Sequence, residues 1–95
     1  MKPKLKRLEK QKRFQNLVDL GCIVCREHYQ VFSPPEIHHI RAGQGMGQRD
    51  DRLTIPLCPV HHRTSSKYSF HLARKFFIET YGTELELLEK VNEFI

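Results

Sequence analysis

The residues with the clearest chemical potential in this chain form two short pairs of metal-binding type, Cys22-x-x-Cys25 and Cys58-x-x-His61. Each pair spans one tight turn, so its two side chains can occupy one side of a tetrahedral metal site. Two such turns complete a closed site of the thiolate and imidazole ligands that Zn²⁺ prefers. The spacing therefore predicts a structural zinc ion held by these four residues, and the alternative is a set of buried free thiols.

Three further histidines, His38, His39 and His62, have no place in that four-ligand site. In a helical backbone the neighbours His61 and His62 diverge by about 100°, so one can close the zinc site while the other points elsewhere. His38 and His39 lie in a segment of strand character, where neighbours face opposite sides. A histidine of the strand and His62 can therefore meet at a second metal position with spare coordination, as catalytic metal sites require.

The elements that must position these histidines lie between the two metal-binding pairs. Cys25 and Cys58 are separated by 32 residues, more than the roughly 12 to 20 of simple zinc fingers and ribbons. Glu36 to Arg41 and Leu53 to Leu57 are short, β-branched segments between breakers, which predicts the two strands of a hairpin. The glycine-rich stretch from Ala42 to Arg52 is long for a hairpin connection, and such loops are usually functional.

Helices are expected on both sides of this hairpin. The apolar spacing predicts helices over Lys4 to Leu20 and Tyr68 to Tyr81, ended by Gly21 and Gly82. Thr83-x-x-Glu86 is a capping box that opens a last helix. The residues expected to face the core of the two C-terminal helices are Leu72, Ala73, Phe76, Phe77, Leu87, Leu88 and Val91.

Length and cysteine count set the class of protein. A chain of 95 residues is expected to form a small domain with a modest core, and such domains often depend on a metal. The three cysteines and the Lys-rich N-terminus, which lacks a signal-like apolar stretch, favour a reduced, intracellular protein over a disulfide scaffold. No apolar stretch approaches the roughly 18 to 20 residues of a membrane span, so a soluble protein is expected.

The positive charge of the chain is concentrated at its N-terminus. Residues 1 to 13 hold seven basic residues and one acidic residue, a local charge of +6, so the remaining residues carry −1. Such clusters suit phosphate backbones and carry no sequence information by themselves; the alternative is a solubilising terminus. The predicted DNA-binding residues are Lys2, Lys4, Lys6, Arg7, Lys10, Lys12 and Arg13.

The motifs together resemble a known family. His38-His39 on a first strand, a second strand leading into CPVHH, and the upstream CxxC are similar to the HNH or ββα-metal nucleases. The segments HHIRAGQGMGQR, IPLCPVHHR and FHLARKFFIETYGTELELL more closely resemble the phage-encoded recombination enhancement (Ref-type) nucleases, which cut DNA in partnership with the RecA filament. The resemblance covers about residues 21 to 91.

The resemblance implies an α+β fold, a small zinc-stabilised ββα-metal domain with additional N- and C-terminal helices. It divides the chain into a basic arm and helix over residues 1–20 and a zinc-bound nuclease domain over 21–95. It also implies a phage- or prophage-encoded protein in the cytoplasm of a bacterial host, acting on DNA with RecA.

The family's chemistry carries over residue by residue. His39 would be the general base that takes a proton from the attacking water, and His38 and His62 would bind one divalent ion, Mg²⁺ or Mn²⁺. The products would be a 5′ phosphate and a 3′ hydroxyl. A neutral imidazole with an ordinary pKa near 6.5 suits the role of base at pH 7. Many HNH enzymes carry an asparagine where this chain has Leu53, so backbone carbonyls of the loop or Gln44 are expected to orient His39.

Secondary roles are predicted for residues beside these motifs. His71 is interpreted as an additional metal or phosphate ligand near His62, or else as a histidine that packs at a helix start. Arg41, Arg49 and Arg63 flank the proposed site and are candidates to hold phosphates on either side of the cut, with Arg41 and Arg63 preferred, although arginines beside a hairpin often form only a solvated surface. His28 has no motif around it and is expected to be a surface or packing residue.

Two other functions remain open on sequence alone. A non-catalytic zinc module that binds nucleic acid or docks a protein would need His61 but has no need of His38, His39 and His62 together. A nuclease specific for RNA or branched DNA would present the same residues, because all these substrates offer the same phosphodiester to the metal.

Overall fold

The two predicted strands pair at the centre of the fold. The computed structural model describes residues 4–41 and 49–95, in which β1 (Glu36–His39) and β2 (Thr54–Leu57) form an antiparallel pair. Glu36 lies opposite Leu57, and His39 lies opposite Thr54. Both strands are shorter than predicted, since Arg41 and Leu53 fall outside them. Gln44 and most of the glycine-rich loop lie outside the described residues, as does Lys2.

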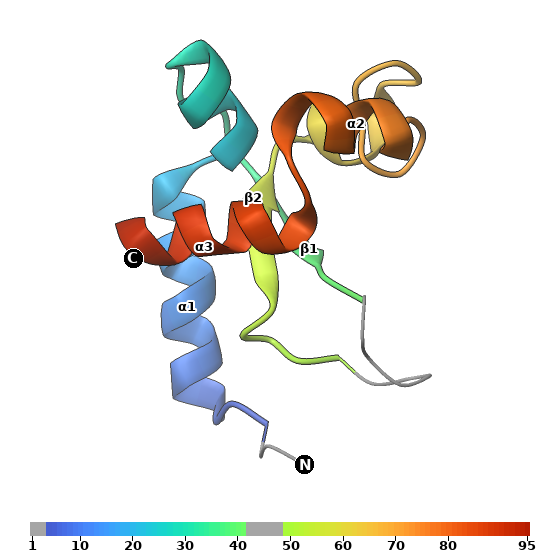
Figure 1. The fold of residues 1–95 in the computed structure, drawn as a ribbon. Helices are drawn as coiled ribbons and strands as arrows, with labels where there is room; N and C mark the ends of the chain where they lie inside the picture. The colour runs from blue at the N-terminus through green and yellow to red at the C-terminus, as the bar shows by residue number, and fades with distance from the viewer. Residues whose placement is uncertain (1–3, 42–48) are drawn as a thin grey trace.

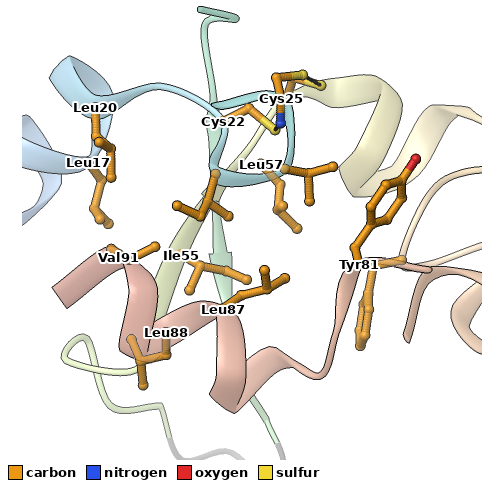
Figure 2. Packing of buried hydrophobic residues seen from close by; sticks show 14 of the residues in the cluster. Leu17, Leu20, Cys22, Cys25, Ile55, Leu57, Tyr81, Leu87, Leu88 and Val91 are labelled. Atoms are coloured by element: carbon orange, nitrogen blue, oxygen red, sulfur yellow. Dashed lines mark hydrogen bonds between the residues drawn. The ribbon is translucent and has the colours of Figure 1, made fainter. Parts of the chain in front are cut away.

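Two helices cover this sheet. Helix α1 (Arg7–Leu20) contacts both strands, and α3 (Glu84–Phe94) crosses β2, while α2 (Arg74–Tyr81) lies at the opposite side of the fold from α1 (Figure 1). Figure 2 shows Leu87 and Val91 of α3 pointing toward Ile55, with Cys22 and Cys25 on the other side of the cluster. The core thus joins residues of α1, the strands and both C-terminal helices around the segment that holds the cysteines.

Helix ends follow the predicted signals. Gly21 ends α1 with a φ of 82°, and a Cβ added there would lie 2.7 Å from the Phe32 ring, so a larger residue would be both strained and crowded. Gly82 ends α2 with a φ of 109°, which also favours glycine, although an added Cβ there would not be crowded. The capping box is confirmed: Glu86 N–H donates to Thr83 Oγ1 at 3.2 Å, and Thr83 N–H donates to Glu86 Oε1 at 3.0 Å.

The helix predicted from Tyr68 begins only at Arg74. Residues 66–72 are mostly turns, because Phe70 N–H and His71 N–H donate to the carbonyls of His61 and His62 instead of to a preceding helical turn. Side-chain hydroxyls also accept local backbone N–H groups here, which competes with helix formation. The turns therefore attach His71 to the segment that carries His62.

Two core assignments on this segment are wrong. Leu72 is 58% exposed and Phe76 is 39% exposed, whereas Phe77 is fully buried, because the late start of α2 changes which face meets the core. The helix predicted from Lys4 likewise begins at Arg7. The remaining cysteine- and histidine-bearing elements are two single π-helical turns, η1 (Cys25–Tyr29) and η2 (Val60–Thr64). Among the described residues, no helix has the length and apolar character that a membrane span needs.

Candidate functional site

The four predicted zinc ligands lie together in a buried cluster. Their ligand atoms are all within 4.8 Å of one another. Nδ1 of His61 lies 3.3 Å from Sγ of Cys58 and 3.5 Å from Sγ of Cys25, and the two sulfurs are 3.8 Å apart. Ligand atoms around a tetrahedral zinc ion are separated by about 3.5 to 3.8 Å, given its usual bond lengths. The donor set and its spacing therefore fit a metal ion such as zinc.

The surroundings of this cluster keep its metal-free thiols protonated and its imidazole neutral. Burial raises the pKa of Cys22 to about 12 and also raises the pKa of Cys58, so metal-free thiols stay protonated at neutral pH. Burial lowers the pKa of His61, which keeps the imidazole neutral and able to coordinate. Tyr29 stacks on the His61 ring, and its hydroxyl contacts that of Tyr81 at 2.7 Å. A bound cation is thus the partner that would let these thiols ionise.

A second cluster consists of His38, His62 and His71, whose ligand nitrogens also lie within 4.8 Å of one another. The ring centroids of His38 and His62 are 5.1 Å apart, and that of His71 lies 5.3 and 4.9 Å from them. The three come from β1, η2 and the turn before α2. Burial, then the charges of His62 and His38, lower the pKa of His71 and favour its neutral, metal-binding form. Three imidazoles suit a divalent transition metal.

A pocket of about 470 Å³ opens above this second cluster. Its wall carries four histidines and three arginines, a composition that attracts an anion such as a phosphate. Arg74, which sequence reasoning missed, places its guanidinium 4.5 Å from the centre of the Phe70 ring, and this contact holds it at the pocket wall. The lining residues are His38, His39, Arg41, Arg49, His62, Phe70, His71, Arg74 and Glu84.

Each of the three predicted catalytic histidines contacts its own carboxylate. Nε2 of His38 contacts Glu84 at 2.5 Å, and Nε2 of His39 contacts Asp51 at 3.0 Å. A third contact, 2.8 Å long, joins Nδ1 of His62 to Glu36. Such partners fix the ring orientation of a histidine and the nitrogen that it leaves open. Sequence reasoning missed all three acids, because Glu84 is far away in the chain and the other two lack a motif.

Within the described residues, the hydrogen-bond partner of His39 is a carboxylate. Gln44 and the glycine-loop carbonyls predicted to orient His39 lie outside the described residues, while Nε2 of His39 contacts the carboxylate of Asp51. His39 also meets Phe14 of α1 edge-on, with ring centroids 6.1 Å apart. His38 and His39 reach different carboxylates on different elements, as alternation along a strand predicts, yet both border the same pocket.

Two of the predicted phosphate-binding arginines make contacts within the protein. Both oxygens of Glu36 accept hydrogen bonds from Arg63, at 2.9 and 2.7 Å, and Arg63 is not among the residues that line the pocket. Arg13 donates to the hydroxyl and the carbonyl of Thr54, both at 2.8 Å, and so ties α1 to β2. Arg41 does line the pocket.

The rest of the basic arm is largely available. Lys10 is half-buried, and its Nζ lies 3.8 Å from a carboxylate oxygen of Asp51. His28, which lies outside the arm, is exposed, and its ring is edge-on to that of Tyr81. The arm cations that remain exposed among the described residues are Lys4, Lys6, Arg7 and Lys12.

Comparison with known proteins gives one family. The family described as "Recombination enhancement, RecA-dependent nuclease" matches residues 8–95. Comparison with curated proteins and with solved structures finds no match. The match includes the Cys₃His cluster, the cluster of three histidines, both strands, α2, α3 and all of α1 after its first residue. The chain therefore belongs to the recombination enhancement, RecA-dependent nuclease family, with a nuclease role in recombination.

Proposed function

We propose that this nuclease is a metal-dependent DNA endonuclease of the HNH class, which hydrolyses phosphodiester bonds to leave a 5′ phosphate and a 3′ hydroxyl. The observation that carries the proposal is the meeting of His38, His39 and His62 at one arginine-lined pocket, separate from the Cys₃His cluster. A purely structural zinc module has no use for this second group. The proposal places the enzyme in the cytoplasm of a bacterial host, encoded by a phage or prophage.

His39 has the environment of a general base. Its Nε2 is occupied by Asp51, which leaves Nδ1 as the nitrogen that takes a proton from the attacking water. The side chain is 15% exposed, so it is sheltered but reachable from the pocket. A base positioned in this way typically contributes roughly 10²- to 10⁴-fold to a rate.

His38 and His62 would hold the single catalytic ion, and His71 lies where it can add a third nitrogen. When bound, a divalent ion supplies a Lewis acid that stabilises charge on the phosphate and on the leaving 3′ oxygen. Of the two ions expected from the sequence, the donor set favours Mn²⁺, because Mg²⁺ prefers oxygen ligands. Glu84, in the pocket wall, and Glu36 would orient the two histidines.

The basic side chains proposed to bind DNA phosphates lie in two places, the pocket and the N-terminal arm. Arg49 and Arg74, together with Arg41, line the pocket where phosphates next to the cut would lie. Lys4, Lys6, Arg7 and Lys12 on and before α1 would act as a clamp that is not specific for sequence. Because each chain has one such pocket among its described residues, each turnover would nick a single strand, and RecA would supply the target.

The proposal is tested by incubating the purified protein with supercoiled plasmid and with single-stranded DNA. Each substrate is tested with Mg²⁺, Mn²⁺ or EDTA, and with or without an ATP-loaded RecA filament. Metal-dependent nicking whose products can be religated by DNA ligase supports the proposal, since ligase requires a 5′ phosphate beside a 3′ hydroxyl. Binding without cutting in every condition would favour the non-catalytic nucleic-acid module.

A further inference from the structure

We infer that Asp51 is a positioning residue that fixes the neutral tautomer of His39, with the proton on Nε2 and the lone pair on Nδ1. The inference rests on the proposed function, because it assigns the nitrogen through which His39 would act as a base. Its starting observation is the 3.0 Å contact between Nε2 of His39 and Oδ1 of Asp51. The two residues are 12 positions apart and approach each other across the hairpin.

The charge state of Asp51 decides the direction of that hydrogen bond. Partial burial raises the pKa of Asp51, but the hydrogen bond with His39 and the nearby charge of Lys10 outweigh it, so the pKa is lowered. An ionised carboxylate only accepts hydrogen bonds. The proton between the two groups must therefore belong to Nε2 of His39. A neutral imidazole that donates from Nε2 carries its lone pair on Nδ1.

The position of Asp51 is itself fixed from two sides. Its backbone carbonyl accepts a hydrogen bond from Thr54 Oγ1 at 2.9 Å, and the same hydroxyl accepts from Nε of Arg13 at 2.8 Å. Its second carboxylate oxygen lies 3.8 Å from Nζ of Lys10. The side chains of Asp51 and His39 are only 16% and 15% exposed, which limits competition from water. This chain of contacts, from α1 through β2, gives Asp51 the rigidity that a positioning residue needs.

The same arrangement explains how the site works with Leu53 where many HNH enzymes have an asparagine. Leu53 is half-buried and packs against the core, and its apolar side chain offers His39 no hydrogen-bond partner. Asp51, two residues earlier, reaches His39 from the end of the loop. The orienting role has thus moved from the strand to the segment just before it.

Asp51→Asn is the informative variant, because an amide keeps the shape of the carboxylate but can donate a hydrogen bond as well as accept one. It therefore permits the tautomer with the proton on Nδ1, which cannot act as the proposed base. Asp50→Asn is the matched control: Asp50 is the neighbouring acid, and its Oδ1 binds Arg52, not His39. Both variants are compared with wild-type protein as zinc-loaded, full-length chains.

Two readouts separate positioning from simple destabilisation. The first readout is long-range ¹H–¹⁵N NMR of ¹⁵N-histidine-labelled protein at pH 8. The His39 signal is assigned by its absence from a His39→Gln sample. Wild type and Asp50→Asn should show only the His39 tautomer with the proton on Nε2. Asp51→Asn should add the Nδ1–H form. In cleavage assays, Asp51→Asn should lower kcat by about 10²-fold or more with little change in KM, whereas Asp50→Asn should stay within about threefold of wild type.

Either of two results would overturn the inference: an Nδ1–H tautomer in wild type, or an Asp51→Asn variant that matches Asp50→Asn in both tautomer and kcat. Wild-type protein that never cleaves would overturn the proposed function instead. In that case the NMR comparison still decides whether Asp51 controls His39, so the two failures can be told apart.

Discussion

Glu36 binds Nδ1 of His62 at 2.8 Å and joins this pocket histidine to Arg63 on the outside of the protein. The hydrogen bonds from Arg63, followed by that of His62, lower the pKa of Glu36 from its ordinary value near 4.5 to about 2. The carboxylate therefore stays ionised across the whole range in which the protein is expected to work. The free energy of unfolding should therefore depend on pH in the range where Glu36 takes up a proton.

Because the pKa of Glu36 is lower in the folded protein, its contribution to stability is complete above about pH 4.5 and disappears as the pH falls toward 2. Comparison of wild type with Glu36→Gln by urea denaturation, from pH 7 to pH 3, should show a difference in unfolding free energy that is constant above pH 5 and shrinks below 4.5. Protonation of the cysteine ligands affects both proteins and cancels in this difference. A difference independent of pH would contradict the assignment, and the exposed Glu89→Gln serves as the control.

Arg74 and Arg63 are expected to differ in how much they contribute to DNA affinity. Arg74 lines the pocket, whereas the charge of Arg63 is neutralised by Glu36. Arg74→Ala should weaken binding to a short duplex and reduce the slope of log affinity against log salt by about one contact, or about 0.9. Arg63→Ala should leave the slope nearly unchanged. The measurement is fluorescence anisotropy of the zinc-loaded protein without added Mg²⁺ or Mn²⁺, over a series of salt concentrations, and equal effects of the two variants would remove Arg74 from the phosphate site.

Arg13 is expected to act on stability more than on DNA. Its guanidinium donates twice to Thr54, and burial lowers its pKa below the ordinary value, as expected for a cation withdrawn from solvent. Arg13→Ala should lower the free energy of unfolding by roughly 1 to 3 kcal/mol, since it leaves the Thr54 carbonyl and hydroxyl with fewer partners. Lys12→Ala, one position earlier and exposed, should change it by less than about 0.5 kcal/mol.

Chemical denaturation of both variants, with DNA affinity measured in parallel, distinguishes these roles. Lys12→Ala should lose more DNA affinity than stability, and Arg13→Ala the reverse. If Arg13→Ala unfolds like wild type and binds DNA poorly, Arg13 belongs to the arm after all.

The Cys₃His cluster predicts that the domain folds only when a metal ion is bound there. Zinc bound to such a site supplies on the order of 10 kcal/mol of apparent folding free energy, and Cys58 is the ligand nearest to His61. Cys58→Ser should therefore lose zinc and give a loosened or unfolded protein, measured by metal analysis and by the dispersion of its NMR spectrum. Ser66→Ala, an exposed position outside both clusters, should retain one zinc ion and the native spectrum. A folded, zinc-free Cys58→Ser protein would show that the four residues are not a structural metal site.

Local signals in the sequence were enough to find the hairpin, the helix ends and the histidines. Strand pairing, the two terminating glycines and the capping box depend on neighbouring residues, so the motifs alone specify them. The CxxC and CxxH pairs point to their cluster for the same reason, because ligands that share one tight turn are placed by that turn.

The rest depends on contacts between segments that are distant in the chain. No pattern indicates that Glu84 reaches His38, since the two residues are 46 positions apart. The late start of α2 follows from backbone hydrogen bonds to η2, and periodicity does not encode these, so Leu72 and Phe76 were wrongly assigned to the core. Arg13 belongs to a basic run by sequence, whereas in the fold it ties α1 to β2 by its contact with Thr54.

The most direct test of the account compares wild type with His39→Ala on supercoiled plasmid in Mn²⁺, with the RecA filament present, while DNA affinity and zinc content are measured on the same samples. Since a general base contributes roughly 10² to 10⁴ to the rate and little to binding, the variant should lose nicking by at least about 10²-fold. Its zinc and its affinity for DNA should be unchanged. Nicking by His39→Ala at a rate near that of wild type would contradict the account, because it would remove the proposed base from the mechanism.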